Sequence, residues 1–235
     1  MADQGKVAVV TGGGRGMGGA IARELHARGY RLALMAPSDS AETLANELEA
    51  VGVRGSAAEA RDLETLVAAA MRAYGRIDAV VNHTGHPPKG DLLSIADDKW
   101  AQGVDLILMS VVRMCRLVTP LMEKQGGGAI VNITTFSAFE PDLRFPVSST
   151  LRAGVSAFTK LYADRYADKG IRMNCVLPGF IDSLSHKPDA GAGVPMKRIG
   201  RVKEIAKTVA FLLSDDAGYI TGQSIRVDGG LTRHV

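Results

Sequence analysis

Short apolar runs alternate along this chain with longer segments in which apolar residues recur every three or four positions. The short runs are typical of buried β-strands, and the spacing in the longer segments is typical of helices with one buried face. The strands predicted in this way are residues 7–11, 32–35, 77–82, 129–134, 171–177 and 224–227. Helices are predicted from the glycine cluster to residue 28, through residues 44–51 and 63–74, over 97–125 with a break near Gly103, and over 148–169 and 203–214.

The order of these segments, strand then helix, is typical of βαβ units that build a parallel sheet with helices on both faces. About seven strands and about six helices or more fit into the chain. No internal repeat, low-complexity tract or linker divides them. We therefore predict an α/β fold, with one Rossmann-type, doubly wound domain over residues 1–235. The segment from Pro188 to Pro195, which contains Gly191 and Gly193, is predicted to be mobile, either as a substrate lid or as an inert surface loop.

Composition excludes several classes of function. The 235 residues include 28 Lys and Arg against 25 Asp and Glu, which gives a net charge of +3. This balance, without a dense basic run, argues against nucleic-acid binding. No signal-peptide pattern opens the chain, and no apolar run approaches the roughly 20 residues of a membrane span. Cys115 and Cys175 lie in apolar runs without metal-ligand spacing, so we expect buried reduced thiols, no metal site and a cytoplasmic protein.

The first predicted strand runs directly into a glycine-rich turn that opens a helix. Glycines at such a turn let the backbone bend tightly and let a pyrophosphate approach the helix N-terminus, where free N–H groups and the helix dipole favour negative charge. Because a strand precedes the cluster and a helix follows it, the pattern predicts a dinucleotide site. The loop residues assigned to this site are Gly12, Arg15, Gly16, Met17 and Gly18.

The glycine spacing after Thr11 resembles that of the short-chain dehydrogenase/reductase family, and further motifs follow in that family's order along essentially the whole chain. They are Asn82-His83-Thr84-Gly85, the stretch from Trp100 to Leu106, Ile130-Val131-Asn132-Ile133-Thr134-Thr135, Pro178-Gly179-Phe180-Ile181-Asp182-Ser183, Ile220-Thr221-Gly222-Gln223 and Val227-Asp228-Gly229-Gly230. The resemblance implies a seven-stranded parallel sheet, NAD(H) or NADP(H), a small-molecule substrate, and a homotetramer or homodimer. It also implies that Asn82, Thr84 and Gly85 line the adenosine ribose, and that Pro178 and Gly179 face the nicotinamide.

The end of the second predicted strand bears on the choice between NAD and NADP. Folds that prefer NAD usually carry Asp or Glu there, bonded to the ribose hydroxyls. This chain reads Ala36-Pro37-Ser38, which offers no carboxylate to repel a 2′-phosphate. Arg15 and the Ser38 hydroxyl can bind such a phosphate, so we predict NADP(H), with NAD as the alternative. Arg15 could equally be an exposed loop side chain, and Ser38 a turn residue or a helix cap.

The positions at which the family carries its catalytic residues hold different side chains. Ala153-Gly154 matches the Ala-Gly after the family's lysine, which places Arg152 at the Lys position and Ser148 at the Tyr position. Thr135 then falls at the Ser position and Asp105 at the Asn position. A Ser hydroxyl is a far weaker acid than a Tyr phenol, whose pKa is about 10, and Arg stays protonated. The family's general acid is therefore missing, a loss on the order of 10² to 10⁴ in rate.

The four substituted residues still indicate a site that stabilises negative charge. Ser148 and Arg152 lie one helical turn apart and share a face. We expect Asp105 to pair with Arg152, and Arg152 to stabilise an oxyanion together with the hydroxyls of Thr135 and Ser148, while water or the substrate supplies the proton. The alternative is that Ser148 caps its helix and Arg152 binds only cofactor. A branch of the family with Ser-x-x-x-Arg in place of Tyr-x-x-x-Lys is similar to this chain.

Two histidines offer another source of a proton. His83 and His86 follow the predicted strand 77–82, and histidine is the natural replacement acid near neutral pH. His86 is the better candidate of the two, although both also fit a role in which they bond loop backbone or face solvent. Lys160 and Tyr162, further along the helix that carries Arg152, are predicted to be structural or interfacial.

The sequence thus predicts an NADP(H)-dependent oxidoreductase that reduces a carbonyl or an activated enone. Two alternatives stay open. One is a non-redox dehydratase, isomerase or lyase that uses Arg152 and Asp105, and the other is a catalytically silent nucleotide-binding protein. Fold alone does not choose among the three, because function lies in the site.

Overall fold

The computed structural model describes residues 5–184 and 189–233. Seven parallel strands form one sheet in the order β3-β2-β1-β4-β5-β6-β7. The strands are β1 (Val7–Thr11), β2 (Arg31–Ala36), β3 (Val51–Arg54), β4 (Ala79–Asn82), β5 (Gly128–Ile133), β6 (Ile171–Pro178) and β7 (Ser224–Val227). This arrangement confirms the predicted α/β, doubly wound Rossmann-type fold.

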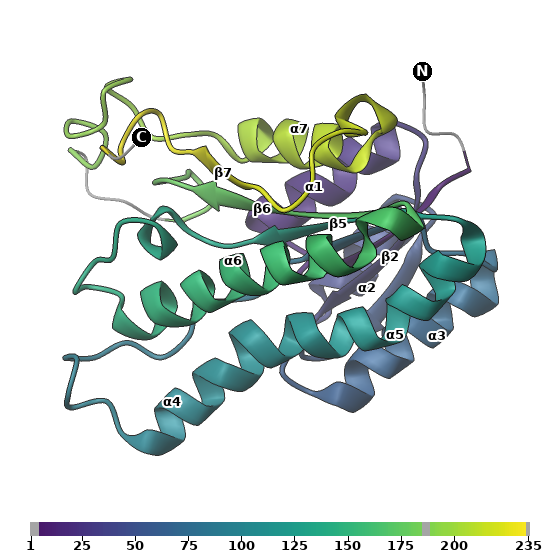
Figure 1. Cartoon of the computed structure of the whole chain (residues 1–235), viewed down its shortest axis with the longest axis horizontal. Coiled ribbons are helices and arrows are strands. Elements are labelled where there is room, and N and C mark those ends of the chain that lie inside the picture. Colours follow the sequence, from purple (N-terminus) through teal and green to yellow (C-terminus); the bar gives the residue numbers. More distant parts are fainter. Residues whose placement is uncertain (1–4, 185–188, 234–235) are drawn as a thin grey trace.

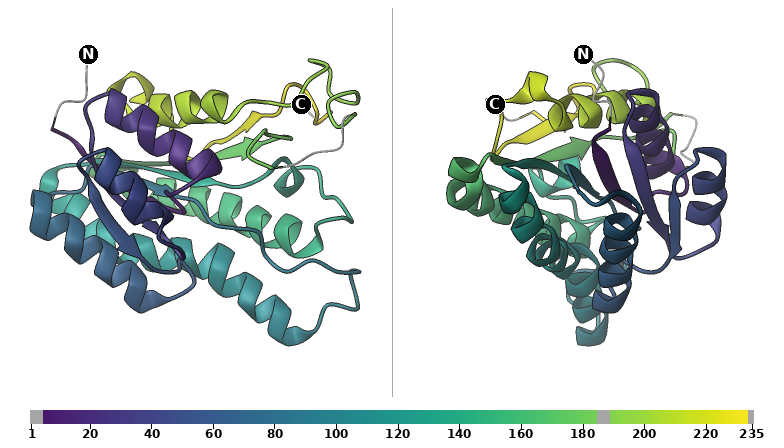
Figure 2. Two further views of the ribbon diagram at one scale, coloured as in Figure 1. Left: turned by 180° about the vertical axis from the view of Figure 1, so that it is seen from behind. Right: turned by 90° about the vertical axis from the view of Figure 1, so that its right-hand side faces the viewer.

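Helices cover both faces of the sheet (Figures 1 and 2). One face carries α1 (Gly16–Ala27), α2 (Ser40–Glu47) and α7 (Val202–Leu213), and the other carries α3 (Ala60–Tyr74), α4 (Asp97–Gly103), α5 (Ser110–Gln125) and α6 (Pro146–Tyr166). Each layer of helices packs an apolar core against the sheet. β1 is buried along its whole length because a central parallel strand has no solvent face, which explains its unbroken apolar run. No helix within the described residues has the length and apolar content to cross a bilayer.

The third strand departs from the sequence pattern, which places Val51 on a helix with Leu44 and Leu48. That prediction is wrong: α2 ends at Glu47, the backbone turns through a left-handed conformation at Glu49 (φ 50°), and Val51 begins β3. The strand has four half-exposed or exposed residues at the sheet edge, so no apolar run marks it. Gly52 lets α2 lie close against it, since a Cβ there would come within 2.7 Å of the Glu42 Cα atom.

The long helical segment over residues 97–125 changes its winding where the sequence predicts a break. α4 ends at Gly103, Val104–Met109 is wound as a π-helix, and α5 continues from Ser110. Gly103 allows α6 to approach, because a Cβ there would lie 2.5 Å from Val147 Cγ1 and 3.0 Å from Leu151 Cδ1. Short π-helical segments are rare and occur frequently at functional sites.

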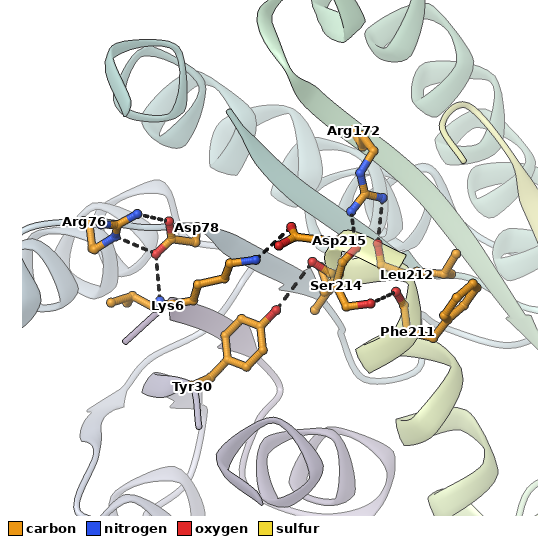
Figure 3. Close-up of polar contacts among 11 residues, drawn as sticks. Lys6, Tyr30, Arg76, Asp78, Arg172, Phe211, Leu212, Ser214 and Asp215 are labelled. Carbon is orange, nitrogen blue, oxygen red and sulfur yellow. Dashed lines mark hydrogen bonds and ion pairs between the residues drawn. The ribbon is translucent and has the colours of Figure 1, made fainter. Parts of the chain in front are cut away.

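The edge formed by the amino ends of the strands is closed by polar contacts (Figure 3). Arg172 at the start of β6 donates to the carbonyl oxygens of Leu212 (2.8 Å) and Ser214 (2.9 Å), and the Tyr30 hydroxyl donates to that of Leu213 (3.4 Å). These carbonyls end α7, where the helix itself supplies no partner. The network fixes α7 to the sheet and leaves the opposite edge, at the carboxyl ends of the strands, for binding.

Candidate active site at the carboxyl edge of the sheet

The strand order reverses between β1 and β4, and ligands of open α/β sheets bind at the carboxyl ends of the strands around such a point. The predicted site residues come from the last residues of β4 and β6, from the segments that follow β1, β2, β4, β5 and β6 at this same edge, and from the π-helix and the first turns of α6 (Figure 1). In the part of the chain that the structure describes, no cluster of three or more acidic, His or Cys side chains could hold a metal ion.

The glycine loop forms a cradle that side chains would fill. A Cβ on Gly18 would lie 2.0 Å from the carbonyl oxygen of Gly12, and one on Gly12 would lie 2.6 Å from the His83 Nδ1 atom. Gly12 and Gly16 both have positive φ values, 59° and 52°. α1 begins at Gly16 after Arg15, whose side chain makes no capping hydrogen bond. The first N–H groups of α1 therefore remain available, and the loop fits a bound pyrophosphate.

The two residues predicted to bind a 2′-phosphate lie together. The Arg15 guanidinium donates to the Ser38 hydroxyl at 3.1 Å, and Ser38 Oγ lies 3.1 Å from Ser40 Oγ. Asp39, rather than Ser38, occupies the N-cap position of α2, so Ser38 is a residue of the turn after β2. Arg15 and Ser38 lie in neighbouring loops at the carboxyl ends of β1 and β2. The Arg15 guanidinium and the hydroxyls of Ser38 and Ser40 therefore lie close together.

Arg152 is a buried cation without a carboxylate partner among the described residues. Only 8 % of the residue is exposed, and its guanidinium donates to Ile133 O at 2.6 Å and, more weakly, to Thr84 Oγ1 at 3.5 Å and Gly85 O at 3.4 Å. Burial lowers the pKa of Arg152 to about 10, so the group stays charged at neutral pH. A buried charge paired only with neutral oxygens costs stability, which is typical of a functional position.

The expected pair of Asp105 with Arg152 is wrong. Asp105 lies in the π-helix and accepts a hydrogen bond from Arg113 at 2.6 Å, and Arg113 also donates to Ala58 O at 2.7 Å. Arg113 stands eight residues beyond Asp105 on the same continuous helical segment, and the π-helical winding between them brings the two side chains together. Sequence reasoning missed Arg113, because eight residues is not a spacing at which side chains of a regular α-helix meet.

The two hydroxyl residues lie at the ends of neighbouring elements. Thr135 follows β5, its Oγ1 accepts from the Ser137 N–H (3.4 Å), and it lies 3.3 Å from Ser137 Oγ. Ser148 is half-buried in the first turn of α6. The alternative role of Ser148 as a helix cap is wrong, because Pro146 is the first helical residue and Phe145 occupies the N-cap position.

The end of β4 is held by buried side chains. Asn82 is 5 % exposed, and its side-chain amide donates to Asn132 Oδ1 at 2.8 Å. Asn132 in turn donates through its own Nδ2 to Thr159 Oγ1 at 2.9 Å. The carboxamide of Asn82 therefore braces β4 against β5, and Thr84 and Gly85 after it contact Arg152. At the end of β6, Gly179 lies against β7, where a Cβ would come within 2.8 Å of the Asp228 Cα atom.

Both histidines lie near Arg152, and the pKa of each is lowered. The backbone N–H of His83 donates to Thr11 Oγ1 (3.0 Å), and its ring lies 3.3 Å from Gly12 O. Burial, and then the charge of Arg152, lowers the pKa of His83 to about 4. Desolvation and the charges of Lys89 and Arg152 also lower the pKa of His86. A lowered pKa reduces the fraction of imidazolium present at neutral pH, which argues against His83 and His86 as the general acid.

The pKa of His83 predicts a pH dependence of stability. Between pH 6.5 and 4 the unfolded chain binds a proton at His83 that the folded protein does not, so the free energy of unfolding falls as the pH falls through this window. We expect the His83→Gln variant to lose less stability than the wild type between pH 7.5 and pH 4.5, by about 2 kcal/mol. Urea unfolding at the two pH values measures this. An equal loss in both proteins would show that His83 is not the group responsible.

The remaining predictions about single residues are resolved by burial. Tyr162 is buried, its hydroxyl pairs with Thr119 Oγ1 at 2.6 Å, and Lys160 forms an ion pair with Asp164, so both have structural contacts away from the site. Cys115 and Cys175 are free, buried thiols with raised pKa values, as expected. Pro188 lies outside the described residues. The part of the expected lid from Asp189 to Pro195 forms turns, with Val194 buried.

Comparison with known proteins decides the family. The model of the family described as "Enoyl-(Acyl carrier protein) reductase" matches residues 12–232. The chain belongs to the short-chain dehydrogenase/reductase family. It is 35% identical over 240 residues to the 3-oxoacyl-[acyl-carrier-protein] reductase FabG of Staphylococcus epidermidis, with 96% of this chain and 98% of that protein aligned. The FabG of Haemophilus influenzae is 36% identical over 238 residues, with 97% and 98% aligned.

A solved short-chain reductase has the same fold. The structure of L-sorbose reductase from Gluconobacter frateurii, complexed with NADPH and L-sorbose, superposes with a TM-score of 0.91 at 28% identity and covers 100% of this chain and 99% of that one. The protein is thus a short-chain dehydrogenase/reductase by sequence and by fold, which makes it an oxidoreductase of this family.

Proposed function

We propose that the protein is an NADP(H)-dependent reductase of carbonyl or activated-enone substrates that works without the family's catalytic Tyr, as a homo-oligomer. The observation that carries the proposal is Arg152, a buried guanidinium without a carboxylate partner among the described residues, at the edge where the glycine cradle and the candidate hydroxyls lie. The reductases that the chain is similar to, one of them complexed with NADPH, support the reaction class and the cofactor.

The chain's own residues divide the work as follows. NADPH, when bound, supplies a hydride to the substrate carbon. Arg152 places a fixed positive charge beside the site, and the Thr135 and Ser148 hydroxyls donate hydrogen bonds to the oxygen on which negative charge develops. That oxygen then takes a proton from water, because the pKa values of both histidines are lowered and no Tyr occupies the position of Ser148. Asp105 accepts a hydrogen bond from Arg113, so we assign it no contact with the reacting atoms.

Arg15 and Ser38 are expected to determine the preference for NADPH. Hydrogen bonds to a charged group contribute about 1.5–3 kcal/mol, so we expect Arg15→Ala to weaken NADPH binding roughly 10- to 100-fold. NADH binding, which lacks the 2′-phosphate, should change less than about twofold. Fluorescence titration of both cofactors measures this, with Arg72→Ala on the exposed side of α3 as the matched control. Equal weakening of NADPH and NADH binding would contradict the assignment of the phosphate site.

The proposed reaction is tested by monitoring NADPH oxidation against a carbonyl panel that includes a 3-oxoacyl thioester and a ketose, the substrate types named for the relatives. We expect turnover of at least one member. NADPH binding without hydride transfer to any member would contradict the proposal and favour a nucleotide-binding protein without redox activity. A protein that binds neither NADPH nor NADH would remove the cofactor assignment as well.

A further inference from the structure

One side chain, that of Arg113, links the loop after β3 to the π-helix of the candidate site. The Arg113 guanidinium on α5 donates to Ala58 O at 2.7 Å through Nη1 and to Asp105 Oδ1 at 2.6 Å through Nη2. A guanidinium is planar and rigid, so two bonds made by its two Nη atoms fix both partners relative to each other. Arg113 is about three-quarters buried, with 25 % of its side chain exposed, which limits competition from water.

Ala58 lies in the loop after β3, next to the turn after β2 that we assign to the adenosine half of the cofactor. The loop after β3 is tied to the end of β2, since the Gly55 N–H donates to Ala36 O at 2.9 Å. The turn that carries Ser38 begins directly after Ala36. Ser56 Oγ accepts the N–H of Ala58 at 3.2 Å, which gives this loop a fixed shape. A ligand bound against the loops after β2 and β3 therefore affects the position of the Ala58 carbonyl, which accepts a hydrogen bond from Arg113.

Asp105 belongs to the other half of the site. It lies in the π-helical segment Val104–Met109, and this segment packs against α6. The preceding residue, Gly103, touches α6 at Val147 and Leu151, the residues immediately before Ser148 and Arg152. Any shift of the π-helix is therefore transmitted to the turn of α6 that carries the candidate hydroxyl and cation, because packed interiors do not deform freely.

We propose that Arg113 is a positioning residue that couples occupation of the adenosine side to the arrangement of the first turns of α6. The coupling rests on the proposed function, since it assumes a cofactor with an adenosine half. It also accounts for the carboxylate at position 105: an Asp binds the guanidinium through a charge-assisted hydrogen bond that a neutral Asn makes more weakly. Arg113 itself contacts no reacting atom in this assignment.

The test uses adenosine 2′,5′-bisphosphate, which can occupy only the adenosine side. Hydrogen–deuterium exchange is measured on the full chain with and without saturating bisphosphate. In the wild type we expect the bisphosphate to slow exchange at least fivefold in peptides from the π-helix and from the first turns of α6. In the Arg113→Met variant, at saturation, exchange in these peptides should change less than twofold. Arg116→Met, an exposed residue on the same helix, is the matched control and should behave as the wild type.

The Asp105→Asn variant makes the test independent of any folding defect in Arg113→Met, because Asp105 is half-exposed. Asp105→Asn should also reduce the protection of α6 from exchange by the bisphosphate. The double variant, with both substitutions, should lose no more of this protection than Arg113→Met alone. Equal protection of α6 in wild type and Arg113→Met, or no protection in the wild type, would overturn the coupling while leaving the proposed function intact. A wild-type protein that does not bind the bisphosphate at all would overturn both.

Discussion

Arg152→Met is expected to lower kcat/KM for carbonyl reduction by about 10² to 10³, the cost of removing one group that stabilises a developing oxyanion. The same change should leave the melting temperature unchanged or raise it. The guanidinium is buried, its pKa is lowered by burial to about 10, and its partners are neutral oxygens, so the charge opposes folding at neutral pH. Steady-state kinetics and thermal unfolding of the purified variant measure the two effects.

Arg165→Met is the matched control for that variant, because it makes the same substitution at an exposed position of the same helix. Its activity and stability should stay close to those of the wild type. Full activity of Arg152→Met would remove the residue from the mechanism. A large loss of stability together with the loss of activity would instead identify Arg152 as a brace between β5 and the loop after β4.

Gly18→Ala is expected to abolish NADPH binding and to destabilise the protein by about 3 kcal/mol or more. The added methyl group would lie 2.0 Å from the carbonyl oxygen and 2.8 Å from the carbonyl carbon of Gly12, so backbone rather than a flexible side chain would have to move. That movement opens the cradle in which the pyrophosphate is expected to bind. Urea unfolding and NADPH titration measure the two consequences.

Gly154→Ala provides the control for that substitution. No atom lies within 4 Å of a Cβ built at Gly154, and the residue is inside α6, where alanine is favoured over glycine by about 0.5–1 kcal/mol. We expect this variant to be as stable as the wild type or more so. If Gly18→Ala bound NADPH normally, the loop would not be the pyrophosphate site.

The fold was largely predictable because strands buried between two layers of helices leave a plain trace in the sequence. Val7–Thr11 is apolar at nearly every position and runs into the glycine turn, so both the strand and the phosphate cradle follow from local pattern. β3 left no such trace, since its four residues are exposed or half-exposed at the sheet edge. A strand of this kind is defined by its partner β2 rather than by its own residues.

The site was predictable in its residues but not in their partners. The motif order located Thr135, Ser148 and Arg152 at one edge of the sheet, and Arg15 with Ser38 at another part of it, before any contact was known. Asp105 pairs with Arg113 because the π-helix rotates the Asp105 side chain toward it. Sequence spacing alone did not distinguish Arg113 from Arg152 as the partner of Asp105. Likewise, the capping role considered for Ser148 depended on where α6 begins, which is Pro146.

The central claim is that this short-chain reductase works without an ionising acid: Ser148 stands at the position of the family's Tyr, and Arg152 supplies a fixed charge one helical turn away. Arg152 has a pKa of about 10 and His83 one of about 4, and the hydroxyls of Thr135 and Ser148 do not titrate in between. Nothing assigned to the reaction should therefore change its protonation state near neutral pH.

The pH dependence of kcat/KM for NADPH-dependent reduction of the best carbonyl substrate tests that claim most directly. We predict a profile that is flat between pH 6 and pH 9, with Arg152→Met lowering it uniformly across the range. An inflection inside that range, reporting a general acid that must be protonated for turnover, would contradict the account.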